Sequence, residues 1–349
     1  MKAKFLQSLL KRFPSRKKKR SKAGFTLIEL LISMMIGAIV ISILLSFVID
    51  LLDRERREYA TSETQREMQL ALDFIANDLR EAVYVYDRID QPRPQGQNQS
   101  DIPALRNFIP VPDGFVPILA FWKSERVPYD NPDDPITCDT SQPACEAIQI
   151  RRRAYSLVVY MQKINQGNDQ QKWKGNSRIV RYVLRKHTNV NNPTLWNPGY
   201  VDPVEKNPPS NNKSSFALWP YGGSPVGSLQ SGTPPQPVGG PPVLIDFVDN
   251  PTRSITNLPG CINTTDQNSR VYSSNPDAPQ YRRVPSDPAI STSFYACVKT
   301  PPAGAAAAAN QDVIIYLRGN PEGKIAGKEP LITIETQAVA RGVINKDPQ

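Results

Sequence analysis

The sequence predicts an α+β protein in which one long N-terminal helix packs on an antiparallel β-sheet. The first observation is a charge-free apolar run at residues 30–49, followed by a stretch whose apolar residues recur at steps of three and four. The second is a series of short runs after residue 110, rich in Val, Ile, Tyr and Phe and bounded by Gly, Pro, Asn or Asp. A helix followed by successive strands is the order of an α+β arrangement.

The basic character of the chain is confined to its N-terminus. The sequence has 349 residues, with 42 Lys+Arg against 33 Asp+Glu and a formal net charge of +9. Ten basic residues and no acidic one lie in residues 1–24, which leaves 32 basic and 33 acidic residues in the remaining 325. A terminal block of like charge is a solvated tail, a nucleic-acid arm or a targeting segment. Because the rest of the chain is nearly neutral, we expect no nucleic-acid partner.

Residues 30–49, LLISMMIGAIVISILLSFVI, have the length of a membrane span. At about 1.5 Å per residue a helix of this run covers roughly 30 Å, the hydrocarbon thickness of a bilayer. The basic block in front predicts that the N-terminus stays cytoplasmic and that the rest of the chain is exported. A cleaved signal peptide has a shorter apolar core with a small-residue site after it, so this run is expected to remain as a single-pass anchor.

The junction KAGFTLIELL, residues 22–31, suggests a more specific interpretation than an ordinary signal-anchor. Gly24 has no side chain and could fit a narrow protease subsite. Glu29 lies five residues into the segment that begins at Phe25, where a carboxylate is costly in apolar surroundings and needs a partner. A short basic leader, Gly-Phe-Thr-Leu-Ile-Glu and a membrane span together closely resemble the signature of type IV prepilins.

This resemblance implies processing and assembly roles for three residues. In type IV pilin-like proteins a prepilin peptidase cuts after the glycine on the cytoplasmic face, and the new N-terminal residue is commonly N-methylated. The resemblance therefore implies a leader at residues 1–24 that is removed, cleavage between Gly24 and Phe25, and N-methylation of Phe25. It also implies that Glu29 pairs with the N-terminal amine of a neighbouring subunit, which would neutralise two charges as apolar helices bundle.

The helix is predicted to continue beyond the anchor. Between residues 54 and 87 apolar residues form one helical stripe, with Arg, Glu, Asp and Gln opposite: Tyr59, Met68, Ala71, Leu72, Ile75, Leu79, Ala82, Val83 and Tyr86. No proline occurs between Pro14 and Pro92, so nothing forces a break. We expect one helix from Phe25 to about Tyr86, with its membrane half at 25–53 and an amphipathic continuation within 54–90.

The remaining residues, 91–349, are predicted to form an extracytoplasmic β-rich domain. Strands are expected at residues 115–122, 147–151, 155–162, 178–186, 243–248, 293–299, 313–318 and 331–340. A polar loop containing Gly167 and Gly175 separates 155–162 from 178–186, which predicts a hairpin. Two irregular stretches, 188–242 and 250–291, are too long for ordinary connections and are expected as loop insertions on one face of the sheet.

The four cysteines indicate disulfides rather than a metal site. Cys138 and Cys145 are seven residues apart, and Cys261 and Cys297 are 36 apart. An exported domain meets an oxidising compartment, so two disulfides are expected. Neighbour pairing, Cys138–Cys145 and Cys261–Cys297, is favoured, although the sequence leaves the connectivity open. No C-x-x-C spacing is present, so a zinc site is disfavoured and no metal is expected.

No catalytic constellation stands out, so we expect neither an enzyme nor a cofactor. The single histidine, His187, lies near a predicted strand end and is expected to be structural or exposed. An acidic loop could hold Ca²⁺, but its proline-interrupted spacing fits no known cage and a solvated loop is favoured; it contains Asp130, Asn131, Asp133, Asp134 and Asp139.

Two further groups of residues could contact a polymer. Aromatic residues in polar loops could stack on sugar rings, although covering the sheet is the favoured interpretation; they are Trp173, Trp196, Trp219 and Tyr221. The run Arg151-Arg152-Arg153 is expected at a strand edge or turn, with contact to an acidic polymer as the alternative.

The resemblance is sharp over residues 16–55 and looser over the helix to residue 86. Three later runs resemble minor subunits of the PilW and pseudopilin-J type: Ser-Phe-Tyr-Ala-Cys-Val (293–298), Asp-Val-Ile-Ile-Tyr-Leu-Arg (312–318) and Ile-Glu-Thr-Gln-Ala-Val-Ala-Arg (334–341). Within that group, the size and loop insertions are most similar to the pseudopilins of hormogonium polysaccharide secretion in cyanobacteria. Main pilins often carry a proline midway through the apolar half, and its absence here weakens the case for a major pilus subunit.

The resemblance implies a structural subunit at the tip or priming position of a type IV pilus-like or type II secretion-like filament. The filament would serve polysaccharide secretion, surface motility or both. The implied partners are prepilin peptidase, other pilin or pseudopilin subunits and the inner-membrane assembly platform, with polysaccharide as a further candidate. The implied location is the inner membrane, then the filament or cell surface. Two alternatives stay open: a membrane-tethered carbohydrate-binding or adhesive module, and a pseudopilin of type II protein secretion.

Overall fold

The computed structural model describes residues 24–93, 101–208, 211–237, 240–255, 258–261, 280–300, 311–325 and 330–340. Of the predicted leader, only Gly24 lies within this range. The chain divides after Glu55 into two compact units, the first up to Glu55 and the second from Arg56. One helix, α1 (Leu27–Arg80), contributes residues to both units.

In the first unit, α1 is apolar and its side chains are exposed. The large hydrophobic residues from Leu27 to Leu52 are all at least about half exposed. Within the described residues, α1 is the one helix long and apolar enough to cross a membrane, with a mean hydropathy of 2.7 in its most apolar part. A continuous apolar surface of this length is stable in lipid or against other helices rather than in water.

In the second unit, α1 is amphipathic and its buried face contributes to the main core. The buried residues lie on one helical face, with repeated spacings of three and four: Ala60, Thr64, Met68, Ala71, Leu72, Ile75, Ala76, Asp78 and Leu79. Most of them join residues of the sheet in a single hydrophobic cluster. The predicted stripe is therefore confirmed from Met68 to Leu79, whereas Tyr59 is 68% exposed.

The helix ends six residues earlier than the predicted Tyr86. It stops at Arg80, and the chain enters strand β1 (Ala82–Val85), which pairs with β2 (Phe115–Arg126). The prediction was wrong here because Ala82, Val83 and Tyr86 fit a helical spacing as well as a strand. Branched and aromatic side chains suit a pleated, half-buried surface, and pairing with β2 decides between the two.

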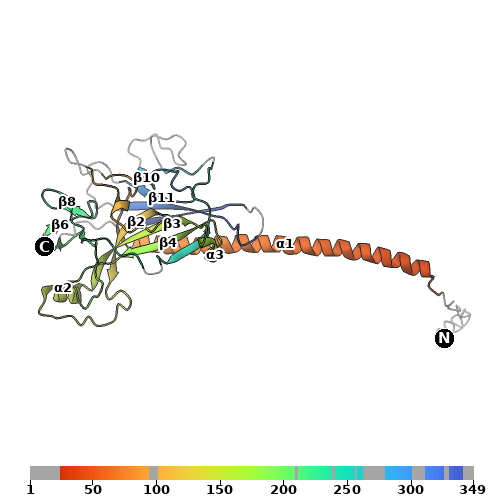
Figure 1. Cartoon of the computed structure of the whole chain (residues 1–349), viewed down its shortest axis with the longest axis horizontal. Helices are drawn as coiled ribbons and strands as arrows, with labels where there is room; N and C mark the ends of the chain where they lie inside the picture. Colours follow the sequence, from red (N-terminus) through yellow and green to blue (C-terminus); the bar gives the residue numbers. More distant parts are fainter. Residues whose placement is uncertain are drawn as a thin grey trace, which may run out of the picture. The chain divides into compact units, whose positions relative to one another are not determined.

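The second unit contains a curled nine-stranded antiparallel sheet in the order β1-β2-β3-β4-β9-β12-β11-β10, with β13 also paired to β12. Strands β2, β3, β4, β10 and β11 of this sheet are labelled in Figure 1. The further strands are β3 (Arg153–Ile164), β4 (Ser177–Leu184), β9 (Val243–Val248), β10 (Tyr281–Val284), β11 (Phe294–Lys299), β12 (Gln311–Gly319) and β13 (Ile332–Ala340). The long helix followed by this sheet confirms the predicted α+β class. The predicted hairpin is β3–β4, which pairs Tyr160 with Arg181.

One predicted strand is wrong. Residues 147–151 form the end of helix α2 (Pro143–Arg151). Pro143 in its first turn has the fixed φ that suits a helix start, and Arg152 ends the helix in a left-handed conformation with φ 46°. Every other predicted strand is present, with ends displaced by up to four residues.

The predicted loop insertion at 188–242 contributes to the core as well as to the surface. It contains two short hairpins, β5 (Lys206–Asn207) with β6 (Asn212–Lys213) and β7 (Tyr221–Gly222) with β8 (Gly227–Ser228). It also supplies Tyr200, Val201 and Trp219 to the main hydrophobic cluster. The remaining short helices are η1 (Leu105–Asn107) and α3 (Asp169–Lys172).

A buried ionic cluster ties α1 to three neighbouring strands. The Asp78 carboxylate accepts hydrogen bonds from Lys123 Nζ of β2 at 2.9 Å, Tyr160 Oη of β3 at 2.7 Å and Arg181 Nε of β4 at 2.7 Å. Burial alone would raise the pKa of Asp78, but the hydrogen bond and charge of Arg181, then Tyr160 and Lys123, hold that pKa below its usual value. Asp78 therefore stays ionised and paired inside the fold.

Strand β12 approaches α1 closely at Gly319, its last residue. A Cβ atom at this position would lie 2.3 Å from Met68 Sδ and 3.2 Å from Thr64 Cγ2. Only a glycine lets the strand and the helix come this close.

A side chain bridges β1 and β12. Gln311 Oε1 accepts a hydrogen bond from the Val85 N–H at 2.7 Å, and Gln311 Nε2 donates to the Val85 carbonyl oxygen at 2.8 Å. Gln311 is buried. Its amide therefore satisfies both backbone groups of Val85, as a neighbouring strand would.

Candidate processing and assembly site

Gly24 and Phe25 precede α1 in irregular backbone, where both are exposed. Phe25 is 80% exposed, and a Cβ atom added to Gly24 would meet no atom within 4 Å. The packing of the described residues therefore gives no reason for a glycine at position 24.

Glu29 lies in the first turn of α1. The N–H groups of Glu29 and Leu30 both donate to the Thr26 carbonyl oxygen, at 3.1 and 3.2 Å, which closes the first helical turn. A carboxylate in this turn interacts favourably with the positive end of the helix dipole. The same position places an acidic group at the start of an otherwise uncharged surface.

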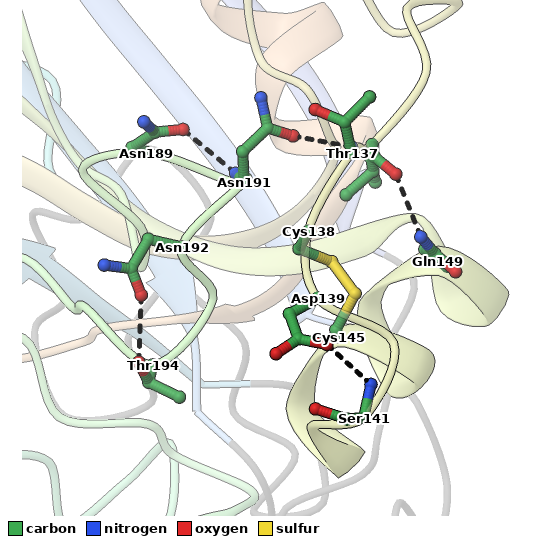
Figure 2. Close-up of a disulfide and its surroundings, with 11 residues drawn as sticks. Thr137, Cys138, Asp139, Ser141, Cys145, Gln149, Asn189, Asn191, Asn192 and Thr194 are labelled. Atoms are coloured by element: carbon green, nitrogen blue, oxygen red, sulfur yellow. Dashed lines mark hydrogen bonds between the residues drawn. A yellow bond between two sulfur atoms is a disulfide. The ribbon is translucent and has the colours of Figure 1, made fainter.

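Both cysteine pairs that the sequence favours lie at disulfide distance. The Sγ atoms are 1.94 Å apart in Cys138–Cys145 and 1.91 Å apart in Cys261–Cys297. Cys138–Cys145 joins a loop to the first turn of α2, as Figure 2 shows. Cys261–Cys297 joins a loop to β11, in which Cys297 is fully buried.

The loop that precedes α2 is held by side-chain amides around the disulfide. The Thr137 N–H donates to Asn191 Oδ1 at 2.8 Å, and Gln149 Nε2 donates to the Ile136 carbonyl oxygen at 2.9 Å (Figure 2). Ile136 and Ile148 belong to a small hydrophobic cluster beneath them. These contacts give the loop a structural role.

The acidic loop does not assemble a cation site. Within the described residues, no three His, Cys, Asp or Glu side chains lie close enough together to hold a metal ion. Asn131 Nδ2 donates to Asp134 Oδ1 at 2.6 Å, and Asp139 Oδ1 accepts from the Ser141 N–H at 2.9 Å. These short-range bonds are those of turns.

His187 is a buried structural residue. It is 6% exposed and forms an isolated backbone bridge with Trp196. Burial, and then the charge of Lys186, lowers the pKa of His187 to about 4. His187 is therefore neutral at physiological pH.

Three of the four aromatic residues considered for sugar stacking pack inside the second unit. Trp219 is fully buried and donates from Nε1 to the Val201 carbonyl oxygen at 2.9 Å. Trp196 lies against Tyr200, and Tyr221 lies against Phe108. Trp173 differs because it lines an open hollow.

The arginine run is divided among structural positions. Arg151 pairs with Glu205, and Arg152 is the left-handed residue that ends α2. Arg153 is the first residue of β3.

The comparison with protein families agrees with the N-terminal features. A family model described as the prokaryotic N-terminal methylation motif matches residues 19–45. This range contains Gly24, Phe25 and Glu29 and supports a type IV pilin-like protein. Searches of curated proteins and of solved structures return no match to the chain.

Proposed function

We propose that this chain is a minor pilin or pseudopilin, a structural subunit of a type IV pilus-like or type II secretion-like filament. The observation that carries the proposal is the N-terminal methylation motif, which runs directly into an exposed, uncharged apolar helix. The proposed processing is cleavage between Gly24 and Phe25 by a prepilin peptidase, followed by methylation of the Phe25 amine. The accessible backbone at Gly24, before the first turn of α1, supports cleavage there.

Assembly requires that the new charge at the N-terminus be neutralised. Cleavage creates a positive amine on Phe25, next to the positive end of the α1 dipole, where a cation is unfavourable. Bringing that amine into apolar surroundings without a partner would cost several kcal/mol. Glu29 is the one acidic residue between Phe25 and Ile49, so we assign it as the partner of the amine of a neighbouring subunit.

The orientation and the position in the filament follow from charge and size. The ten basic residues in 1–24 favour a cytoplasmic N-terminus and an extracytoplasmic second unit. The second unit, from Arg56 onward, carries long insertions that would fit poorly in a closely repeating shaft. A tip or priming position is therefore proposed, in contact with other pilin-like subunits and the inner-membrane assembly platform. Polysaccharide secretion, with or without surface motility, is the proposed process.

The cleavage is tested by changing the glycine. The Gly24→Val variant should stay in membranes as the longer, unprocessed chain, because a branched side chain cannot enter a subsite built for glycine. The length is read from gel mobility and from the mass of the N-terminal peptide. Gly37→Val is the matched control, because a Cβ there also meets no atom within 4 Å and the position lies inside the anchor. Normal trimming of Gly24→Val would contradict the assignment.

The pairing role is tested by neutralising the carboxylate. Glu29→Gln should be trimmed normally but should be depleted from sheared surface filaments, while Glu29→Asp retains part of the incorporation. Glu55→Gln, an exposed position on the same helix, is the control. Wild-type amounts of Glu29→Gln in the filaments would remove the pairing argument. The process served is tested by deleting the gene and measuring exported polysaccharide, exported protein and surface movement separately.

A further inference from the structure

A polar hollow lies beside the connection between β3 and β4 in the second unit. Its volume is about 530 Å³. Five of its lining residues carry side-chain amides: Asn165, Gln166, Gln170, Asn176 and Asn250. The other lining residues include one aromatic side chain, Trp173, and two cations, Lys174 and Arg253. This composition differs from the apolar lining of most small-molecule pockets.

One of these amides is held by hydrogen bonds within the protein, and two others are available to a ligand. Asn165 is buried, and its Nδ2 donates to the Gly175 carbonyl oxygen at 2.8 Å and to Asp246 Oδ1 at 2.7 Å. Within the described part of the chain, the side chains of Gln166 and Asn176 make no hydrogen bond. Each of these two amides therefore offers a donor and an acceptor to a ligand, which is the combination that hydroxyl groups require.

Trp173 supplies an apolar surface next to these amides. Its backbone N–H donates to the Asp169 carbonyl oxygen at 2.8 Å and caps α3, which fixes its position at the hollow. The buried Arg178 and the exposed Lys172 lie over the ring, 5.6 and 5.0 Å from its centroid, so a stacked sugar has to displace the exposed Lys172 side chain. An indole beside hydrogen-bonding amides matches the two faces of a pyranose ring, one of C–H groups and one edged by hydroxyls.

The hollow carries excess positive charge. The buried Asp249 carboxylate is shared by Arg318 at 2.9 Å and by Arg253 at 3.1 Å, so one negative charge faces two positive ones. Asp169 is shared in the same way by Lys163 and Arg178. Lys174 donates from Nζ to the neutral Gln170 carbonyl oxygen. Asp246, nearby, offsets part of this excess and holds the Lys174 and Gly175 N–H groups. The remaining charge favours an anionic ligand.

A second hollow adjoins the first, so the two together could take more than one sugar unit. The second hollow, of about 740 Å³, shares Thr252 and Arg253 with the first and is also lined by Arg283 and by Arg282, which is paired with Asp87. The shared wall places Arg253 between two hollows with basic linings. A chain of acidic sugars fits this arrangement better than a single small molecule does.

We propose that these residues form a binding site for an acidic polysaccharide. Trp173 stacks on a sugar ring, Gln166 and Asn176 bond its hydroxyl groups, and Arg253 and Lys174 contact its carboxylates. The site goes beyond the proposed function because it assigns a ligand to the second unit whether or not the chain enters a filament. Its test is therefore independent of the Gly24 and Glu29 variants.

The test measures binding of uronic-acid hexasaccharides to the full chain in detergent micelles by calorimetry. The probes are hexagalacturonate, hexaglucuronate, the methyl ester of each, and polyphosphate of equal charge. We expect at least one free acid to bind about tenfold more tightly than its ester and than polyphosphate, and to weaken as salt is added. Equal affinity for acid and ester, equal affinity for polyphosphate, or no binding of either acid would each overturn the proposal.

Variants then locate the site. Trp173→Ala and Arg253→Gln should each weaken binding about tenfold, Arg253→Gln should also reduce the salt dependence, and Trp173→Phe should retain most of the affinity. The control is Arg126→Gln, which removes an exposed arginine at the other end of the β2–β3 pairing. Melting curves establish that each variant is folded. Wild-type affinity in folded Arg253→Gln and Trp173→Ala would show that the sugar binds elsewhere.

Discussion

Arg181 on β4 donates a hydrogen bond from Nε to Oδ2 of Asp78 on α1 at 2.7 Å, although the two residues lie 103 positions apart. A second donor from the same guanidinium reaches Asp78 Oδ1 at 3.3 Å. Asp78 also neutralises Lys123 on β2. One carboxylate on α1 therefore contacts cations from two strands of the sheet, and Lys123 is also paired with Glu81 at 3.2 Å.

Removing this carboxylate should strongly destabilise the second unit. Asp78→Asn leaves Lys123 and Arg181 without their shared anion, and breaking a buried ion pair costs about 3–5 kcal/mol. Urea denaturation of the full chain in detergent, followed by tryptophan fluorescence, measures the loss. Asp73→Asn, on the exposed face of the same helix, should leave the midpoint unchanged. Equal midpoints for Asp78→Asn and the wild type would show that the cluster adds no stability.

Acidification should reduce stability through His187 before it affects Asp78. The pKa of His187 is about 4 in the folded chain and near 6.5 in the unfolded chain. Between pH 4 and pH 6.5 the unfolded chain therefore binds more protons than the folded chain does. The free energy of unfolding therefore loses nothing through His187 above pH 6.5. It falls by on the order of 2 kcal/mol as the pH is lowered towards 4 and His187 becomes protonated on unfolding. The Asp78 contribution, with its lowered pKa, is lost only below about pH 4.

The variant His187→Gln separates these two effects. Its free energy of unfolding should be nearly independent of pH between 6.5 and 4.5, whereas that of the wild type falls. Denaturant titrations at several pH values provide the comparison. A wild-type slope retained in His187→Gln would assign the pH dependence to another group.

The close approach of β12 to α1 should make Gly319 intolerant of a side chain. Gly319→Ala places Cβ against Met68, which is fully buried, and overpacking of this kind costs about 1–3 kcal/mol. Gly227→Ala is the matched control, because its Cβ meets no atom within 4 Å and its φ is not positive. A double-mutant cycle with Met68→Ala should show a coupling energy between the two positions. Strict additivity would mean that the clash is relieved elsewhere.

The two disulfides should contribute unequally to the free energy of unfolding. The loops they close differ in length, seven against 36 positions, and the chain-entropy model gives about 2 kcal/mol for Cys138–Cys145 and about 4 kcal/mol for Cys261–Cys297. Paired Cys→Ser variants of each bridge give the two values from denaturation midpoints. Hydrogen exchange should show that loss of Cys138–Cys145 affects mainly the loop and α2. A larger midpoint loss for the shorter bridge would reverse the predicted order.

The sequence predicted those parts of the fold that local patterns determine. Periodicity predicted the buried face of α1 from Met68 to Leu79, and two β-branched and aromatic runs flanking a polar loop predicted the β3–β4 hairpin. It failed where one pattern fits two structures. Ala82–Val85 and residues 147–151 have spacings compatible with either a helix or a strand, and the partner strand or the local capping residues decide. Contacts between distant residues, such as Asp78 with Arg181, have no local signature.

The two candidate sites also differ in whether a local sequence pattern or contacts between distant residues define them. The junction around Gly24 and Glu29 is a contiguous motif, so the sequence alone was enough to single it out. The hollow beside Trp173 combines residues 164–176 with Asn250, Thr252 and Arg253, which only the pairing of β4 with β9 brings together. Trp173 could be suggested from its polar surroundings, but its free amide neighbours could not.

The Gln311 amide has a consequence for neighbouring molecules. Unpaired N–H and carbonyl groups on an edge strand are a template on which another chain can add a strand. Gln311 occupies both groups of Val85, so β1 offers no free backbone pair at that residue. A glutamine that caps an edge strand from within its own fold thus removes the hydrogen-bonding template at this residue.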